Sequence, residues 1–397
     1  MCRVFSIVVL AVVALTSVAS GQTGTFLDRH SPLDVRVADY NVNWDSIFPD
    51  DDPDNHPWRA FNKVAEFRRL IAAINPDIMC LQEINSARDP QDVADIFDET
   101  IPLAGGQWHA AIGYDCVIVS RYPLSMIAEQ TDPPGYNPQS LSLVDLPNEL
   151  FASDLYVMNE HYKCCSGGDN EAKRQQQSDA LANWMRDAKA VGEFIDLPAG
   201  TPMIVTGDLN IVEGPGPLDT LLTGDISDEG TYGGDSPPDW DDSDNTDSWP
   251  LHNAIGPDDY TWRNDGGGYD PGRLDYMIFT DSVAASQHKF ILNTTIMTQA
   301  ELDATGLQEY DMVLDPPGRF DHLPIVMDLR LVLAVQPDGD VSLDASVDGR
   351  DVAWFVDLAA AGALADPLRV AHGDFDGSGL IDTGDLPAFV GAMLAGG

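Results

Sequence analysis

The sequence predicts an α/β fold, a sandwich of β-sheets with helices, followed by a small helical module. Short apolar runs alternate with segments of helical periodicity along most of the 397 residues. Several of the apolar runs end in a polar or charged residue. Residues 339–397 instead repeat an acidic loop followed by an apolar helix.

The first residues read as a targeting segment. Arg3 precedes an apolar core, Ile7–Leu15, which is followed by small residues. This core is shorter than the about 20 apolar residues that a membrane crossing needs. We therefore expect a cleaved secretory signal over residues 1–21 rather than an uncleaved anchor. No later segment is long and apolar enough to span a bilayer, which predicts a secreted or cell-surface protein without stable membrane insertion.

Acidic residues dominate the charge. The chain has 65 Asp and Glu against 21 Lys and Arg, a formal charge of −44 and a pI near 4.1. Such a field repels polyanions at long range and attracts divalent cations. It argues against nucleic-acid binding through a broad basic face and leaves open a local basic cluster inside a cleft.

Four cysteines remain after the signal: Cys80, Cys116, Cys164 and Cys165. In an exported protein disulfides can persist, and four cysteines allow three pairings among which the sequence does not choose. Cys80 lies in an apolar strand and fits a buried thiol. A bridge from the adjacent pair to Cys116 is one option.

Six predicted strands carry polar residues at one end. Taken alone each is ordinary, and GDLN by itself most simply marks a strand that ends in an Asx turn. Together they suggest a site gathered at one edge of a sheet sandwich. The strands and their polar residues are Asp34–Val42 with Asn41, the run from Asp77 with Glu83, Leu155–Asn159 with His161, Met203–Val205 with Asp208 and Asn210, Arg273–Ile278 with Asp275, and Leu323–Met327 with Asp321 and His322.

An amphipathic helix is predicted over Trp58–Asn75, and a long helix over about Glu171–Val191. Further short strands are expected at Trp108–Ile112 and Cys116–Ser120. Gly224–Trp249 holds nine Asp or Glu and no basic residue, and it predicts a mobile loop.

Seven motifs then occur in order between about Asp34 and Leu331: YNVN, LQEI, SRYP, NEHYK, GDLN, RLDY and DHLPI. In these the chain resembles the endonuclease/exonuclease/phosphatase superfamily. The resemblance implies a four-layer α/β sandwich of two mostly antiparallel sheets flanked by helices, with a catalytic domain over residues 25–332. It also implies hydrolysis of a phosphoester with a divalent metal, Mg²⁺ or Mn²⁺.

The same resemblance assigns a metal site. Glu83 supplies the hard oxygen ligand that such a cation prefers. Asn41 is a further ligand or an orienting group, and Asp321 assists at the metal. Asn43 stands where some relatives carry an aspartate, which weakens the case for a second metal ion.

The acid and base roles also follow from the resemblance. His322 is the expected general base, and Asp275 fixes its tautomer and raises its basicity. His161 is expected to act as an acid or to stabilise the phosphate. Asp208 and Asn210 are expected to position the nucleophile and a phosphate oxygen.

Basic residues that grip a polyanion are scarce. Arg121 and Lys163 are the predicted contacts to a substrate phosphate, and Lys173, Arg174 and Arg273 are further candidates. For each of them a solvated surface charge is the alternative.

The substrate stays open among several classes. Extracellular nucleic acid is the first expectation, a sphingomyelinase-like phospholipid phosphodiesterase is the second, and phosphatase action on a monoester is the third. A protein that keeps the sandwich without activity, as a surface or binding protein, is the alternative from another class. The sequence makes no prediction of oligomeric state.

After a predicted linker at residues 333–338, two units follow about 34 residues apart. They resemble a type I dockerin module, which implies bound Ca²⁺ and a cohesin-like partner; a disordered acidic tail is the alternative. Ala345 replaces the turn glycine in the first unit and predicts a weaker site there. The expected calcium positions are Asp340, Ser342, Asp344, Ser346, Asp348 and Asp351 in the first loop, and Asp374, Asp376, Ser378, Leu380, Asp382 and Asp385 in the second.

Overall fold

The computed structural model of the chain describes residues 23–48, 62–130, 139–192, 195–264, 267–312 and 320–396. The predicted signal segment lies outside the described residues. So does the beginning of the predicted helix Trp58–Asn75, of which α2, Val64–Ile74, is described. Within the described part of the chain, no helix has the length and apolar character needed to cross a bilayer.

Two six-stranded mixed sheets form the larger part of the molecule. Most neighbouring strands are antiparallel, whereas β1 and β2 are parallel, as are β7 and β8. In spatial order the first sheet contains β11 (Ala284–Ile291), β12 (Ile325–Leu331), β1 (Asp34–Asn41), β2 (Ile78–Gln82), β4 (Cys116–Ser120) and β3 (His109–Gly113). The second contains β5 (Leu124–Gln130), β6 (Gln139–Val144), β7 (Leu155–His161), β8 (Met203–Asp208), β10 (Asp275–Phe279) and β9 (Thr246–Asp247).

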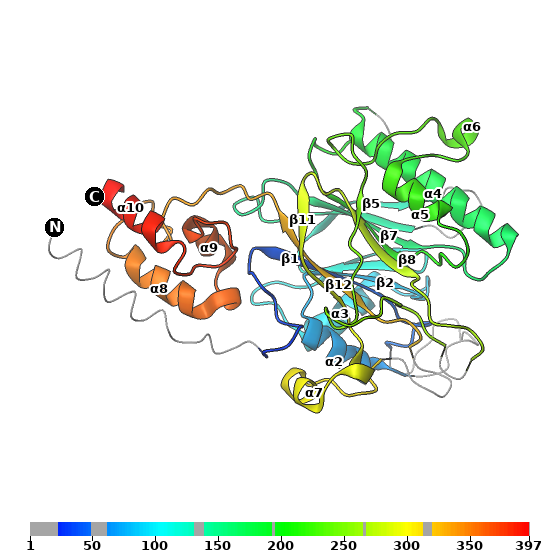
Figure 1. Cartoon of the computed structure of the whole chain (residues 1–397), viewed down its shortest axis with the longest axis horizontal. Coiled ribbons are helices and arrows are strands. Elements are labelled where there is room, and N and C mark those ends of the chain that lie inside the picture. The colour runs from blue at the N-terminus through cyan, green and yellow to red at the C-terminus, as the bar shows by residue number, and fades with distance from the viewer. Residues whose placement is uncertain are drawn as a thin grey trace. The chain divides into compact units, whose positions relative to one another are not determined.

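Helices flank both sheets, as Figure 1 shows, with α4 and α5 beside β7 and β8 and with α2 and α3 on the side of β2. This confirms the prediction of two sheets flanked by helices and is consistent with a four-layer α/β sandwich. The helices of this part are α2, α3 (Pro90–Thr100), α4 (Gly168–Lys189), α5 (Gly216–Thr223), α6 (Glu229–Tyr232) and α7 (Gln299–Thr305).

The period-two pattern of β7 explains how the second sheet is covered. Tyr156 and Met158 pack in one apolar cluster with Leu181 and Trp184 of α4. Asn159 points to the opposite face, where its amide donates to backbone oxygens of β2 and β4. One strand therefore contributes to a helix-covered core on one face and to a polar layer between the sheets on the other.

The acidic segment Gly224–Trp249 is more ordered than the sequence predicts. It contains α6 and β9, and basic residues of α4 hold it. Arg186 donates to the carbonyls of Tyr232 and Gly234, and Lys189 donates to that of Asp239 at 2.6 Å. Cations supplied from a neighbouring helix thus offset a segment that has none of its own.

By compactness the chain divides into two units. One comprises residues 36–146 and 153–329, and the other comprises residues 1–35, 147–152 and 330–397. In the second unit, a bridge pairs Phe151 with Leu333, at the start of the predicted linker, and Ala334 N donates to the Leu150 carbonyl. Ser31 Oγ donates to the Gly379 carbonyl at 2.6 Å.

The C-terminal helices are α8 (Asp351–Ala361), α9 (Pro367–Gly373) and α10 (Leu386–Gly396). The rings of Phe355 and Phe389, which are equivalent positions of the two repeats, stack with centroids 4.2 Å apart. His372 and Asp338 are equivalent positions as well, and His372 Nδ1 lies at hydrogen-bond distance, 2.9 Å, from Asp338 Oδ1. Each repeat therefore buries its apolar helix against the other.

All four described cysteines are free thiols. The Cys116 sulfur is buried and bonds to Gln139 Oε1 at 3.3 Å. The considered bridge from the adjacent pair to Cys116 is therefore wrong, because the strand β4 commits Cys116 to the interior.

Glu160 is a buried carboxyl group, and its Oε1 has no hydrogen-bond partner. Burial raises the pKa of Glu160 well above its ordinary value. Because the folded state then binds the proton more tightly than the unfolded state, this group's contribution to stability is fully present below pH 4.5 and is lost as pH rises through the folded-state pKa.

We therefore predict that Glu160→Gln unfolds with a higher free energy than the wild type at about pH 8, by on the order of 1–3 kcal/mol. The difference should shrink toward about pH 5, where the wild-type carboxyl is protonated. Denaturant titrations of both proteins across this range measure it. Glu149→Gln, at an exposed position, is the matched control and should show no such trend. A pH-independent gap would contradict the assignment.

Candidate active site

Strand register brings the predicted polar ends together. Asn41 pairs with Gln82 at the ends of β1 and β2, one residue before Glu83. In the other sheet Asp208 pairs with His161 on one side and with Asp275 on the other. Because these strand ends lie at one edge of each sheet, side chains that are far apart in the sequence form one cluster.

Local geometry explains the GDLN motif. Gly207 has φ of 138°, and a Cβ there would lie 1.9 Å from the Glu160 carbonyl oxygen, so only glycine fits. Asp208 Oδ1 accepts the backbone N–H of Asn210 at 3.0 Å, and Asn210 takes a left-handed φ of 48°. The motif is thus an Asx turn, and the turn aims the second oxygen of Asp208 into the cluster.

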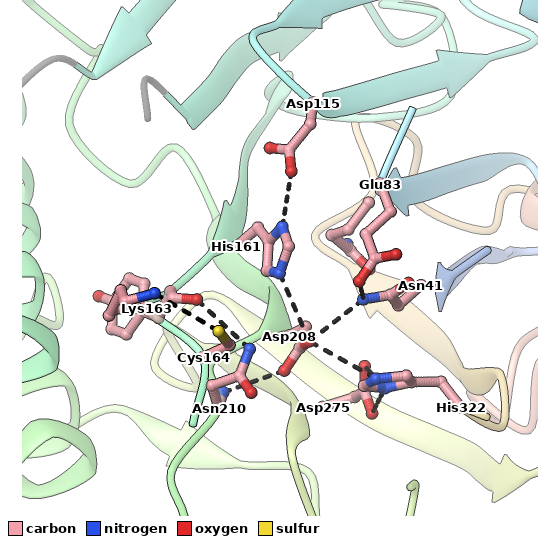
Figure 2. Close-up of polar contacts among 12 residues, drawn as sticks. Asn41, Glu83, Asp115, His161, Lys163, Cys164, Asp208, Asn210, Asp275 and His322 are labelled. Atoms are coloured by element: carbon pink, nitrogen blue, oxygen red, sulfur yellow. Dashed lines mark hydrogen bonds and ion pairs between the residues drawn. The ribbon is translucent and has the colours of Figure 1, made fainter. Parts of the chain in front are cut away.

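Three side chains converge on Asp208 Oδ2 (Figure 2). Asn41 Nδ2 donates to it at 3.2 Å, and the Nε2 atoms of His161 and His322 lie 3.7 and 3.6 Å away. Asp208 and His322 are 2% and 4% exposed. Two imidazoles, one at the end of β7 and one shortly before β12, therefore face one carboxylate oxygen in a largely dehydrated site.

His322 is oriented by Asp275. Its Nδ1 lies 2.8 Å from Asp275 Oδ2, and Thr261 Oγ1 accepts the Asp275 backbone N–H at 2.9 Å. Burial disfavours the imidazolium, but the carboxylates of Asp275 and Asp208 outweigh burial and hold the pKa of His322 well above its ordinary value. The pair fixes which ring nitrogen faces the cluster.

His161 is oriented by Asp115, which the sequence analysis missed. His161 Nδ1 lies 2.7 Å from Asp115 Oδ2, and its backbone N–H donates to Gln139 Oε1 at 2.6 Å. Burial opposes the charged ring, yet Asp115, Asp208 and Glu83 raise the pKa of His161 to about 10. Asp115 sits in the turn between β3 and β4, where an aspartate is so ordinary that the sequence carries no signal of this role.

Glu83 has both oxygens placed by neighbours. Asn41 Nδ2 donates to Oε1 at 3.1 Å, and the Trp44 N–H donates to Oε2 at 2.9 Å. Burial raises the pKa of Glu83 to about 7, and the charge of Asp321 adds to the rise. The amide nitrogen of Asn41 therefore faces both Glu83 and Asp208, and it orients these two carboxylates.

Asp321 is held by two donors at the edge of this cluster. Asn43 Nδ2 donates to Oδ1 at 3.0 Å, and Trp262 Nε1 donates to Oδ2 at 3.1 Å. Trp262 was not among the predicted site residues, although it follows the Tyr260-Thr261 pair that precedes the last strands. Asn43 thus serves as a hydrogen-bond donor to the Asp321 carboxylate.

A polar layer continues beneath the site. Gln82 Nε2 donates to Asp39 Oδ1 and to Asn159 Oδ1, each at 2.7 Å, which joins the two sheets. Asp39 is fully buried, and burial together with the charge of Asp275 raises its pKa well above the ordinary value. These contacts fix the distance between the sheets directly beneath the side chains of the candidate site.

The two predicted phosphate contacts, Arg121 and Lys163, lie at different distances from the site. Arg121 pairs with Asp77 at 3.0 Å, and Ser120 pairs with Ile78, the first residue of β2. Arg121 therefore lies at the start of β2, whereas Glu83 follows the other end of this strand. The structure therefore does not bring Arg121 to the site. Lys163 follows His161 by two residues, and its Nζ donates to Cys164 Sγ at 3.4 Å.

Two of the further basic candidates are also committed elsewhere. The Arg174 side chain is fully buried and pairs with Glu171 and Glu213 at 2.8 and 2.9 Å. Arg273 pairs with Asp247 and lies over the ring of Trp249. Neither guanidinium is a solvated surface charge.

The donor set fits a divalent cation. Carboxylate oxygens are the ligands that Mg²⁺ prefers. Burial has raised the pKa of Glu83, and a neighbouring cation would stabilise the ionised form of this carboxyl group. Asp208, Asp275 and His322 also place one potential ligand atom each within 4.8 Å of one another. Within this group, the Asp275 carboxylate is also bonded to His322 Nδ1.

The profile of the Endonuclease/Exonuclease/phosphatase family matches residues 40–295. The chain belongs to this family, whose members are metal-dependent phosphoester hydrolases. No curated protein matches the sequence.

Several solved structures are similar to the chain at low sequence identity. TDP2 of D. rerio complexed with single strand DNA product is 15% identical, covering 75% of this chain and 98% of its own, with a TM-score of 0.45. The human Nocturnin catalytic domain with bound sulfate is 14% identical, covering 76% and 95%, with a TM-score of 0.44. A mannosyl-6-phosphatase of Bacteroides thetaiotaomicron is 13% identical, covering 74% and 99%, with a TM-score of 0.44.

We predict that Asp115→Asn lowers the pKa of His161 from about 10 in the metal-free protein, because the variant removes the carboxylate bonded to Nδ1. Proton–nitrogen NMR titration of the histidine rings measures the change. His252, which bonds to the Tyr260 carbonyl at 2.7 Å, serves as the internal reference.

The same variant tests how protonation of His161 is coupled to the stability of the fold. The raised pKa means that the His161 contribution to stability is complete below pH 6.5 and lost as pH rises through about 10. The wild type should therefore lose more unfolding free energy across this interval than Asp115→Asn does. Identical titration of His161 in both proteins would show that Asp115 does not set its charge.

Proposed function

We propose that the protein is a secreted phosphodiesterase that hydrolyses extracellular nucleic acid. One observation carries the chemistry: the Nε2 atoms of His161 and His322 lie 3.7 and 3.6 Å from the same Asp208 oxygen, each ring being held from behind by its own carboxylate. An acid and a base held on two sides of one position suit in-line displacement at phosphorus, where water enters and an alcohol leaves.

The residues divide this work between them. His322 Nε2, in the neutral form of the ring, takes the proton of the attacking water, which Asp208 Oδ2 aligns, and Asp275 stabilises the imidazolium that forms. His161 Nε2 donates to the leaving oxygen or to a non-bridging phosphate oxygen. Asn210 helps to position the phosphate.

Glu83 and Asp321 would hold the cation. A bound Mg²⁺ or Mn²⁺ would offset the charge of the phosphate oxygens and polarise the bonds to phosphorus. Asn41 keeps Glu83 and Asp208 in place beside it.

The substrate proposal follows from where the positive charge lies. With a net charge of −44 and with Arg121, Arg174 and Arg273 committed to acidic partners, a long duplex gains little from the protein surface. Lys163 is the basic residue that we assign to a substrate phosphate. We therefore expect flexible or single-stranded nucleic acid to be cleaved better than duplex DNA.

We predict that His322→Ala and His161→Gln each lower kcat by about 10²–10⁴-fold, because each removes a proton-transfer group. The assay compares single-stranded and duplex DNA, RNA, sphingomyelin, a generic phosphodiester and a phosphomonoester, with Mg²⁺, Mn²⁺, Ca²⁺ or chelator. Wild-type turnover should require Mg²⁺ or Mn²⁺.

His109→Gln is the matched control, since His109 pairs with Ser120 at the strand end away from the cluster, and it should keep full activity. A wild type without activity on any phosphoester would refute the enzymatic proposal in favour of a binding protein. Preference for sphingomyelin or for the monoester would refute the nucleic-acid proposal alone.

We further propose that residues 339–397 form a dockerin-like calcium module, with residues 333–338 as its connection. The two loops make equivalent hydrogen bonds. Gly379 N donates to Asp374 Oδ2 at 2.8 Å, and its counterpart Ala345 N donates to Asp340 Oδ2 at 2.7 Å. Asp374 is 7% exposed, and its Oδ1 has no partner, as expected of an oxygen aimed at a cation.

Two features of the loops support the proposal that the first binds calcium more weakly than the second. Ala345 takes φ of 64° where Gly379 takes 86°, a conformation that costs a non-glycine residue on the order of 1 kcal/mol. Arg350 also places its guanidinium 2.6 Å from Asp344 Oδ2, a calcium position of the first loop, whereas Gly384 is the equivalent residue of the second.

We predict two calcium-binding events by calorimetry, the tighter of which is lost in Asp374→Ala and the weaker in Asp340→Ala, with affinities about tenfold or more apart. Arg350→Gln should tighten the weaker event because it frees Asp344. A cohesin-like protein is the partner that the resemblance implies for the calcium-loaded module. Unchanged proteolysis and circular dichroism on chelation would contradict the calcium proposal.

A further inference from the structure

Two adjacent cysteines lie three and four residues after the end of β7. The sulfurs of Cys164 and Cys165 lie 2.9 Å apart, and these side chains are partly exposed and exposed, respectively. Cys80 and Cys116 are both buried. Among the four described cysteines, the adjacent pair is therefore the one that a reagent in solution reaches.

The loop of this pair adjoins the active site (Figure 2). The Tyr162 N–H donates to the Asp208 carbonyl at 2.9 Å, and its own carbonyl accepts Asn210 Nδ2 at 3.3 Å. The next residue, Lys163, donates from Nζ to Cys164 Sγ at 3.4 Å. One short stretch thus connects the thiols to the proposed phosphate contact and to the turn that holds Asp208.

Arg174 clamps the backbone on both sides of the pair. Its Nη1 donates to the carbonyls of Lys163 and Cys165 at 2.8 and 2.9 Å. Its Nη2 pairs with Glu171 and Glu213, and the side chain is fully buried. Breaking these bonds is costly, because it would leave a buried charge with fewer partners.

We propose that Cys164 and Cys165 are a redox site that closes to a vicinal disulfide by exchange with a small disulfide, and that closure displaces the loop carrying Lys163. In the first step the thiolate of one cysteine attacks the small disulfide, forms a mixed disulfide and releases one thiol. In the second step the other thiolate attacks the protein sulfur of that bond and releases a second thiol. The two protons of the cysteines leave with the released thiols, so that the protein is oxidised and the small disulfide reduced.

Geometry makes this disulfide both strained and reversible. Adjacent Cα atoms are about 3.8 Å apart across a trans peptide, whereas disulfides usually join Cα atoms about 4.4–6.8 Å apart. Closing the ring therefore requires the peptide between Cys164 and Cys165 to change its geometry, and Arg174 holds the peptides on either side. The oxidised loop must weaken one of the Arg174 bonds, which shifts Lys163 and loosens the Tyr162 contact to Asn210.

The test uses the full-length protein treated with oxidised or reduced glutathione. Trypsin cleaves after Lys163 and Lys173, so both cysteines fall in the peptide Cys164–Lys173, which contains no other cysteine. We expect this peptide to be two hydrogens lighter after oxidation and to regain them on reduction. Hydrogen exchange should accelerate at the amides of Lys163 and Gly167, which donate to Gln177 and Glu213.

Cys165→Ser is the matched variant, because it removes the exposed sulfur and leaves the Lys163 contact to Cys164 in place. It should show neither the mass change nor the faster exchange. A wild-type peptide that stays a dithiol, or that carries only glutathione adducts, would overturn the redox site. A vicinal disulfide that forms without any change in exchange at Lys163 and Gly167 would overturn its coupling to the loop. Neither readout depends on phosphodiesterase activity.

Discussion

The second carboxylate oxygen of Asp208 is the contact on which the site depends. Asn41, His161 and His322 all face it, and they come from both sheets. The Asx turn with Asn210 aims this oxygen, and the lack of a side chain at Gly207 lets β8 lie close enough to β7. A change in any of these strand ends therefore moves the same point in the site.

The cost of gathering so much charge explains the electrostatics. Burial raises the pKa values of Glu83, Asp208 and Asp39, because each carboxylate has lost water and faces other acids. The same acids raise the pKa values of His161 and His322. Without a metal, imidazolium ions and protonated carboxyl groups offset the negative charge of the cluster. A divalent cation supplies positive charge where the carboxyl groups most need it.

Basic residues show how local sequence patterns mislead. Arg121 and Arg174 were both candidates for anion binding, because the sequence shows only that each is charged. Register places Arg121 at the far end of β2, and folding buries Arg174 against two glutamates. Arg174 instead fixes the backbone of the loop that begins at Lys163. This role depends on hydrogen bonds to the carbonyls of Lys163 and Cys165, which no sequence motif indicates.

The sequence by itself determined the family, the order of the strands and most residues of the candidate site. Asp208, Asp275 and His322 could be named because a phosphoester site needs acids and imidazoles at strand ends, and the chain places them in motifs with a fixed order. The repeat of 34 residues likewise showed both acidic loops, since each ligand position is local in sequence.

Tertiary structure alone decided which partner each of these groups has. Asp115 became the support of His161, Trp262 a donor to Asp321, and Arg350 the partner of Asp344 in the first acidic loop. Cys116 proved to be buried apart from the adjacent thiols. The physical reason is that hydrogen bonds and ion pairs depend on distances of a few ångströms between residues far apart in the chain, and strand register and packing set those distances.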